Sequence, residues 1–284
     1  MTATAAAHPQ ATEPRATEPR PRFSDLVAAE WIKLRSLRST WLGYGATALA
    51  VLAFNVGTAY DTYRNWSQQN PEGPEGFIRS GLPLDEAFTV NAVTVMMLAL
   101  GALGAMPIVG EYATGTIRTT LAAVPARRSV MAAKVVVVTA VAAVFGAFVA
   151  GVSFAATQAI LGRRDAGVSL GDPGALRVVV ASALLAPLCA LVGLALGTVL
   201  RQTAATMIAS VAVILVLPIV LTDGRHWSAV ASHCTLYQAW LRLVAVDYHP
   251  LHYPWTVAGA WTVYAVWAAA TAVIAVVAVH RRDQ

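Results

Sequence analysis

Charge is scarce in this chain and is missing altogether from six long stretches. Charged residues make up 12% of its 284 residues, against about 25% in a typical soluble domain. The stretches without Asp, Glu, Lys, Arg or His are 39–60, 87–110, 135–162, 178–200, 202–222 and 253–279. Each exceeds the roughly 20 residues that a helix needs to cross a bilayer. Because lipid cannot satisfy backbone polar groups, the stretches predict an all-α integral membrane protein with six transmembrane helices.

Lysine is rarer than any other charged residue type. The chain has only Lys33 and Lys134, and neither follows a glycine. A P-loop requires Gly-Lys-Ser or Gly-Lys-Thr to hold nucleotide phosphates. The sequence therefore excludes ATP hydrolysis by a P-loop, and we expect no catalytic residues in this chain.

The predicted spans also lack the ionisable side chains on which several membrane mechanisms depend. Ion-coupled carriers usually place such a side chain at mid-membrane, and an intramembrane serine protease needs a histidine inside a span. Active transport would therefore need an energy source outside the chain. A substrate path would be lined by apolar or weakly polar side chains, each of which is also a candidate packing contact. The candidates are Asn91, Thr94, Met97, Thr206 and Ser210.

Residues that could bind a metal are few. Cys189 falls within a span and Cys234 in a loop, so the sequence predicts no disulfide framework and no cysteine-based metal cluster. His249 and His252 have the spacing of helical metal ligands, but Pro250 between them disfavours a helix. We expect no metal site, and a metal-dependent membrane enzyme is the least favoured alternative.

The chain has a net charge of +5 at pH 7, and its basic residues are unevenly distributed among the loops. With both termini in the cytoplasm, the cytoplasmic segments hold most of the 20 lysines and arginines, as the positive-inside rule requires. One loop is discordant, because Arg163, Arg164 and Arg177 would face outward. The charge therefore predicts an orientation and contact with membrane lipid, and no nucleic-acid partner.

The N-terminal region divides into a tail and an amphipathic segment. Residues 1–22 repeat the pentapeptide Ala-Thr-Glu-Pro-Arg and predict a disordered tail, followed by a six-helix transmembrane domain at 23–284. Residues 23–38 predict an amphipathic helix in the cytoplasmic interface, with a basic face. Its apolar residues at helical spacing are Phe23, Val27, Trp31, Leu34 and Leu37.

Two loops on the predicted outer side differ in character. The loop 61–86 is acidic and rich in Pro and Gly, so we expect an ordinary exposed connection. The loop 223–252 contains an apolar patch at helical spacing, which predicts a re-entrant or interfacial helix. The patch consists of Leu236, Trp240, Leu243 and Val244.

The segment 110–134, between the second and third spans, predicts a compact basic hairpin on the cytoplasmic face. The second span is expected to end near Pro107. Gly115 can adopt the left-handed conformation that closes a helix, and Thr116 can cap a new one. Ile117 and Leu121 share one face of that short helix, and Pro125 ends it. Arg127, Arg128 and Lys134 then lead into the third span.

Two of these segments resemble the permease subunits of type-2 ABC exporters. The run that contains Glu30, Trp31, Lys33 and Arg35, followed by Trp41, resembles the interface helix of that family. The residues between the second and third spans are similar to the family's pattern of Glu, Gly-Thr, Pro, Arg and Lys. That pattern falls here on Glu111, Gly115, Thr116, Pro125, Arg127 and Lys134. The likeness covers the chain from about Phe23 onward.

The resemblance implies a transmembrane permease that pairs with a second copy or a homologue and docks a cytosolic ABC ATPase through 116–124. ATP and Mg²⁺ would be bound by that ATPase, with no cofactor in this chain. Glu111 would brace the hairpin against Arg118 or Arg128, while Ile117 and Leu121 would fill a cleft of the ATPase. The complex would export its substrate across a bacterial cytoplasmic membrane, and the apolar lining inferred for the path would favour a hydrophobic one. A channel or structural subunit that works without ATP is the alternative.

Overall fold

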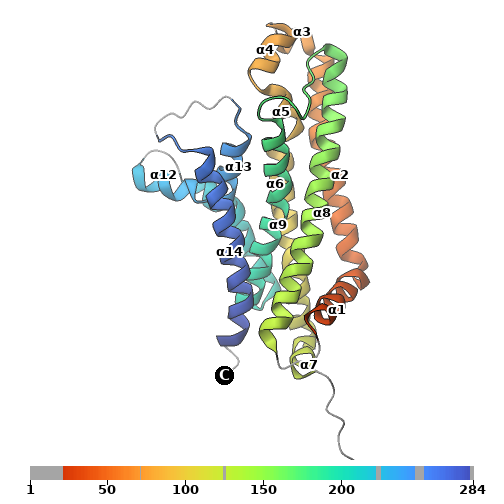
Figure 1. The fold of residues 1–284 in the computed structure, drawn as a ribbon, viewed down its shortest axis with the longest axis vertical. Coiled ribbons are helices and arrows are strands. Elements are labelled where there is room, and N and C mark those ends of the chain that lie inside the picture. The colour runs from red at the N-terminus through yellow and green to blue at the C-terminus, as the bar shows by residue number, and fades with distance from the viewer. Residues whose placement is uncertain (1–21, 71, 124–125, 222–224, 247–252, 282–284) are drawn as a thin grey trace, which may run out of the picture.

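The computed structural model describes residues 22–70, 72–123, 126–221, 225–246 and 253–281. Within these residues the regular elements are all helices, and the long ones run roughly side by side in an elongated bundle (Figure 1). The predicted tail lies outside the described residues except for Arg22. Pro125, His249 and His252 lie outside them as well.

Six helical segments are long and apolar enough to cross a membrane, which confirms the predicted number of spans. The second segment joins α5 to α6, and the fifth consists of α10, a π-helical turn and α11. The elements of the six segments are α2 (Arg38–Arg64), α5 (Leu82–Ala87), α6 (Val90–Thr114), α8 (Arg127–Leu161), η1 (Gly162–Arg164), α9 (Ala175–Leu200), α10 (Thr203–Val211), η2 (Ala212–Val216), α11 (Leu217–Val220) and α14 (Val257–Arg281).

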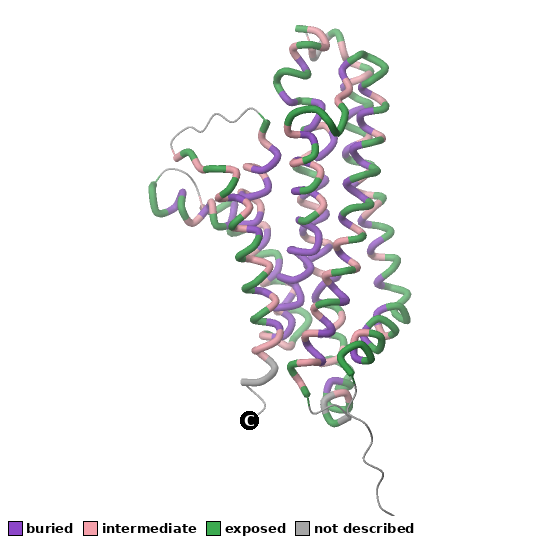
Figure 2. Tube along the Cα trace, viewed as in Figure 1, coloured by how far each residue is buried: buried purple, intermediate pink, exposed green. Residues whose placement is uncertain are grey.

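The fourth span, α9, is the central helix of the bundle. It packs against α6, α8, α10 and α14, and most of its residues are buried (Figure 2). Glycines let the backbones of α6 and α9 touch: a Cβ atom on Gly193 would lie 1.8 Å from the carbonyl oxygen of Gly101. One on Gly104 would lie 2.1 Å from the carbonyl oxygen of Ala190. Small residues thus allow α6 and α9 to pack closely, as is common where lipid supplies no hydrophobic driving force between helices.

The second span does not end near Pro107, as the sequence predicted. Instead α6 continues through this proline to Thr114. Membrane helices tolerate proline because neighbouring groups satisfy the backbone that the ring disrupts. The extra turns carry Glu111 past Pro107 along the same helix.

The outer connection 61–86 is not the simple exposed loop that its composition predicted. It contains α3 (Trp66–Gln69), α4 (Gly73–Arg79) and the start of the second span. Phe77 of α4 is 4% exposed and packs with Leu161 and Ala166. Pro74 and Pro83 lie in the first turns of α4 and α5, where a missing amide hydrogen costs nothing. Prolines that suggested a loop therefore begin helices.

Buried polar side chains fasten this outer end to the bundle. Asn55 of α2 donates to the Ser153 hydroxyl of α8 at 2.7 Å and accepts from the Thr89 hydroxyl at 2.8 Å. Ser153 in turn donates to the carbonyl oxygen of Ala87. In the discordant loop, the Arg164 guanidinium donates to the carbonyl oxygen of Tyr63. At least one of the arginines in this loop is therefore bound to a backbone carbonyl oxygen of the protein.

The predicted helix in the last outer loop is present. It is α13 (Leu236–Val244), preceded by α12 (His226–His233). The four apolar residues of its patch are buried, and Trp240, 1% exposed, donates its indole hydrogen to the Ser182 hydroxyl at 3.0 Å. The patch packs against α9 and α14.

The N-terminal segment forms a helix, α1 (Phe23–Ser36), and only part of it packs against the bundle. Leu26, Glu30 and Leu34 are buried, whereas Phe23 and Trp31 are 48% and 41% exposed. The cause is electrostatic, because Glu30 pairs with a buried lysine and turns this face of α1 toward α8. An apolar-periodicity argument could not include a glutamate in the buried face.

Candidate functional site

The hairpin predicted between the second and third spans projects beyond the ends of the neighbouring long helices (Figure 1). Its first turn is made by Gly115, whose φ of 72° is the left-handed conformation that the sequence predicted. Thr116 is the first residue of α7 (Thr116–Ala123) and does not cap it from outside. Its hydroxyl lies 2.9 Å from that of Thr114 and donates to the Glu111 carbonyl oxygen. The Thr116 hydroxyl therefore gives a hydrogen-bond donor to a carbonyl oxygen in the last turn of α6.

The two faces of α7 differ in exposure. Ile117 is 7% exposed and packs in the main core of this chain, and its contact with a cleft of another protein stays a prediction. Arg118 and Thr119 are exposed. The side chain of Leu121 and the whole of Pro125 lie outside the described residues. The described exposed surface of α7 is therefore mostly polar, with Arg118 as its cation and Ala122 as an apolar position.

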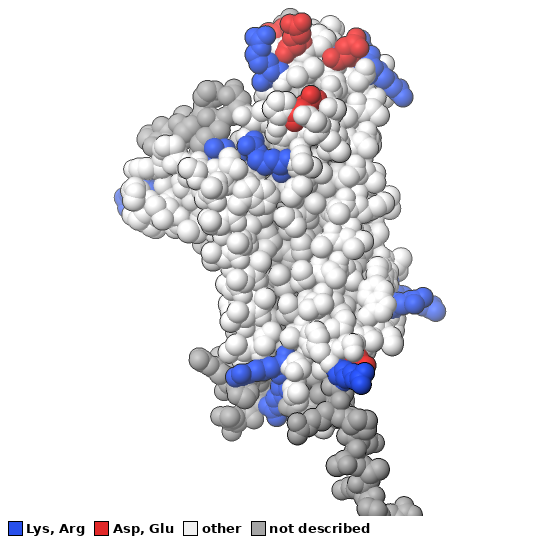
Figure 3. Space-filling view, viewed as in Figure 1, with Lys and Arg blue, Asp and Glu red and all other residues white. Residues whose placement is uncertain are grey.

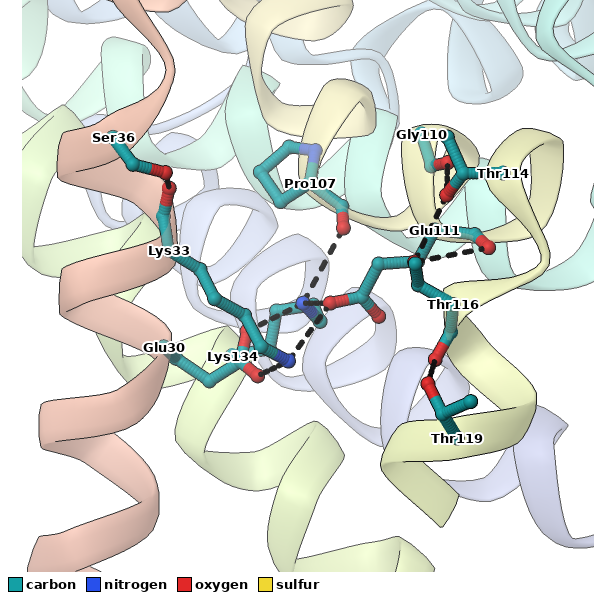
Figure 4. Close-up of polar contacts among 10 residues, drawn as sticks. All are labelled: Glu30, Lys33, Ser36, Pro107, Gly110, Glu111, Thr114, Thr116, Thr119 and Lys134. Atoms are coloured by element: carbon teal, nitrogen blue, oxygen red, sulfur yellow. Dashed lines mark hydrogen bonds and ion pairs between the residues drawn. The ribbon is translucent and has the colours of Figure 1, made fainter. Parts of the chain in front are cut away.

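Four charged side chains meet where α7 joins the bundle, and we call them the charge cluster: Glu30, Lys33, Glu111 and Lys134 (Figure 4). Lys134 Nζ of α8 contacts Glu30 Oε2 of α1 and lies 3.0 Å from Glu111 Oε1 of α6. Lys33 Nζ lies 2.8 Å from Glu30 Oε1 and 3.0 Å from Glu111 Oε1. Each lysine thus bridges the same two carboxylates, and three helices are joined.

The charge cluster is largely withdrawn from solvent. The exposed fraction is 2% for the Lys134 side chain, 6% for Glu30 and 12% for Glu111, while Lys33 is 42% exposed. Lys134 Nζ also donates to the carbonyl oxygen of Pro107 at 3.3 Å. Buried charges persist only when paired and hydrogen-bonded. Two positive and two negative groups satisfy that condition with no net charge.

The pairing shifts the pKa values of the two α1 residues. Burial acts to raise the pKa of Glu30, but the charge and hydrogen bonds of Lys134, assisted by Lys33, outweigh it and lower this pKa. Burial acts to lower the pKa of Lys33, yet its hydrogen bonds to Glu30 and Glu111 raise it. Both residues are therefore held in their charged forms around neutral pH.

The partners of Glu111 differ from those predicted. It pairs with Lys33 and Lys134, not with Arg118 or Arg128, which are exposed. One signal could have found the cluster: the only two lysines of the chain both belong to it. The pairing itself spans 104 residues between Glu30 and Lys134, which no local pattern encodes.

A cavity of about 360 Å³ lies beside the charge cluster. Its walls come from α1, α6, α7 and α8, and all four charged residues line it. Leu34, Met106 and Val138 supply apolar surface. The junction of these helices is therefore hollow next to its ion pairs and leaves room for the helices to shift.

The remaining predicted interface and coupling residues lie outside the charge cluster. Trp31 and Trp41 meet edge to face, with ring centroids 6.3 Å apart. Arg35 is exposed and Arg127 is half-buried. Figure 3 shows basic side chains at both ends of the molecule, whereas the acidic ones gather mainly at the end where α3 and α4 lie.

The predicted substrate-path residues do not form one continuous lining. Thr94 and Met97 line a cavity of about 200 Å³ between α6, η2 and α13. Thr206 and Ser210 are buried and donate to the carbonyl oxygens of Gln202 and Thr206, four residues earlier in each case. Asn91 is exposed.

Comparison with known proteins gives one match. The model of a family described as "ABC-2 family transporter protein" matches residues 26–222, which is more than half of the chain. The matched region contains the charge cluster and α7. No curated protein matches the chain.

Proposed function

The chain belongs to the ABC-2 transporter family and is a multi-pass membrane component of a transporter, and we propose that it is the permease of an exporter driven by a separate ATPase. Hydrolysis of ATP would then take place on the partner, and this chain would convert the motion of that partner into movement of substrate.

The observation that carries the proposal is the charge cluster at the base of α7. A helix that receives force from a motor must be tied to the spans, or its motion is lost. Glu111 lies at the start of the hairpin, and its carboxylate is bound to lysines of α1 and α8. A displacement of α7 would therefore be transmitted to α1 and to the third span through charge-assisted hydrogen bonds, which are the stronger kind.

The distribution of charge supports an orientation with α7 in the cytoplasm. Arg35, Arg118 and Arg128 are exposed on the α1, α7 and α8 segments near that end, and cytoplasmic segments are enriched in Lys and Arg. The helix α14 ends on the same side as α7 (Figure 1). Both chain termini would thus be cytoplasmic, and α3 and α4 would be external.

The apolar character of the spans supports a hydrophobic cargo. The six predicted spans contain no Asp, Glu, Lys, Arg or His, so a polar or charged substrate would meet few matching groups. On the fifth span, Ile208 is 71% exposed and Ile219 is 67% exposed. Lipid or a second permease, either a copy or a homologue, would cover this surface.

Co-purification tests the proposal. The tagged full chain, extracted from its own cells in mild detergent, should bring down a P-loop ATPase that mass spectrometry identifies. Thr119→Trp adds bulk to the exposed face of α7 and should reduce recovery of that ATPase by roughly tenfold, since about 1.4 kcal/mol is sufficient.

Ser67→Trp is the matched control, because Ser67 is exposed at the opposite end of the bundle. It should leave recovery of the ATPase unchanged. If no P-loop ATPase accompanies the unaltered chain, the exporter proposal fails and a channel or structural subunit that works without ATP becomes the better account.

A further inference from the structure

A groove lies on the flank of the bundle between α1, α2 and α8. Its volume is about 580 Å³, and the side chains that line it are all aliphatic or aromatic. Trp31, Val144 and Phe148 belong to its walls and are exposed. Because α2 and α8 are membrane-spanning helices, these exposed apolar walls open toward lipid.

Aromatic contacts form the floor of the groove and join its three helices. Trp31 of α1 meets Trp41 of α2 edge to face. The ring of Trp41 lies 6.0 Å from that of Tyr44, one turn further along α2, measured between centroids. The ring of Tyr44 in turn lies 5.1 Å from that of Phe145 in α8. Aromatic pairs at these separations attract one another beyond their buried area, so the groove has a packed floor.

The length of the groove matches one leaflet of a bilayer. Its wall on α8 runs from Val136 to Phe148, which is about 18 Å along the axis at 1.5 Å per residue. One leaflet contributes about half of a hydrocarbon core that is roughly 30 Å thick. Val27 and Trp31 of α1 line the groove at the end of the bundle that carries α7 (Figure 1). The groove therefore spans the leaflet on the α7 side.

Two arginines lie beside the groove where α1 meets α2. Arg35 follows Trp31 by four residues, and Arg38 precedes Trp41 by three. Residues at these spacings share one face of a helix, so each arginine is on the same face as a tryptophan of the groove. Both arginines are exposed. Positive charge is therefore placed at the end of the groove where a lipid headgroup would lie.

The acidic residues of α1 are engaged away from these arginines. Asp25 accepts a hydrogen bond from the backbone amide of Arg22 at 2.9 Å. Glu30 is buried and pairs with Lys33 and Lys134 in the charge cluster. The carboxylates of α1 therefore leave the guanidinium groups of this helix and of the start of α2 open to an external anion.

We propose that this groove binds one acyl chain of an anionic phospholipid, with the lipid phosphate against Arg35 and Arg38. Guanidinium groups match phosphate oxygens in pairs, and basic residues beside a membrane span attract anionic lipids. The bound lipid would hold α1 to α2 and α8, and α1 carries Glu30 and Lys33 of the charge cluster. The proposal holds with or without an ATPase partner.

A second copy of the permease is the less suitable occupant. It would have to cover the two exposed arginines at the groove, and burying a charge without a partner is costly. The exposed apolar surface of the fifth span is a separate region, because α10 packs against α6 and α9, whereas the groove is formed by α1, α2 and α8.

Competition between two lipids tests the site. The purified full chain in mild detergent is mixed with equal amounts of phosphatidylglycerol and phosphatidylcholine of the same acyl chains, and native mass spectrometry counts the lipids retained. The unaltered protein should prefer phosphatidylglycerol by about tenfold or more. Arg35→Gln/Arg38→Gln should bring the two lipids close to parity. Ala140→Phe places a ring on the wall of the groove and should reduce retention of both lipids.

Matched controls make the same exchanges elsewhere. Arg79→Gln/Arg163→Gln removes the same charge from exposed positions at the opposite end, and Ala204→Phe adds the same ring at an exposed position of α10. Both should retain lipid as the unaltered protein does. Equal retention of the two lipids by the unaltered protein overturns the proposal, as does an equal loss of preference in the control pair.

Full lipid retention in Ala140→Phe would also overturn the proposal, because the acyl chain would then lie outside the groove. If this variant instead shifts the mass of the protein from dimer to monomer and leaves lipid retention unchanged, the groove is occupied by a second copy of the chain.

Discussion

Replacing Lys134 with methionine is expected to destabilise the protein by about 3–5 kcal/mol, as removal of one partner from a buried ion pair commonly does. Methionine keeps much of the volume but leaves Glu30 and Glu111 buried with Lys33 as their remaining cation. Unfolding of the purified protein in detergent, followed by tryptophan fluorescence, measures the loss. Lys33→Met is the matched control, and its effect should be smaller because Lys33 is 42% exposed.

The dependence on pH distinguishes this electrostatic account from a simple packing defect. The folded state lowers the pKa of Glu30, so its contribution is present above the ordinary value of 4.5 and is lost as pH falls through the lowered pKa. Lys33 behaves oppositely: its contribution is present below 10.5 and is lost as pH rises through the raised pKa. The difference in the free energy of unfolding between Lys134→Met and the unaltered protein should therefore shrink below pH 4.5. A difference that stays constant to lower pH would point to packing.

Glu111→Gln is expected to weaken the coupling between ATP hydrolysis and the conformational change of the permease by at least about tenfold. The carboxylate accepts hydrogen bonds from Lys33 and Lys134 at 3.0 Å each. Bonds to charged groups contribute about 1.5–3 kcal/mol, and a coupling loss of about 1.4 kcal/mol corresponds to a factor of ten. Glutamine keeps the shape but not the charge. Glu30 stays paired with both lysines, so the variant should still insert and fold.

The measurement uses the permease reconstituted with its ATPase and spin labels at exposed sites on α1 and α4. The distance change on trapping with ATP and vanadate should largely disappear in Glu111→Gln, while ATP hydrolysis continues. Glu75→Gln, at an exposed position on α4, should behave as the unaltered protein. An undiminished distance change in Glu111→Gln would remove the charge cluster from the mechanism.

The number and approximate positions of the spans were predictable because they follow from one strong constraint. Lipid excludes charge and unsatisfied backbone, so six charge-free stretches predicted six helices, which the structure contains. The ends of the spans were less predictable. Composition placed a helix end at Pro107 and a loop at Pro74, yet the structure has helix at both positions. Proline in the first turn of a helix costs no hydrogen bond, and proline inside a membrane helix is tolerated where neighbouring groups satisfy the backbone.

The members of the candidate site were predictable, but their pairing was not. Glu30, Lys33, Glu111 and Lys134 all belonged to motifs visible in the sequence, whereas Arg118 and Arg128 were the expected partners of Glu111. Sequence proximity favoured those arginines. The structure selects lysines from α1 and α8 because the helix ends converge there and bury the pairs. The face of α1 that packs against the bundle was not predictable for the same reason, since its central residue is a glutamate.

Cysteine labelling from either side of the membrane tests most directly whether α7 faces the compartment that contains ATP. Arg118→Cys is introduced with Cys234→Ser, because Cys234 is exposed whereas Cys189 is buried. A membrane-impermeant maleimide should leave this cysteine unmodified in intact cells and modify it in inverted vesicles, with Glu75→Cys showing the reverse pattern. Modification of position 118 from the external medium would contradict the account, since no cytosolic ATPase could then reach α7.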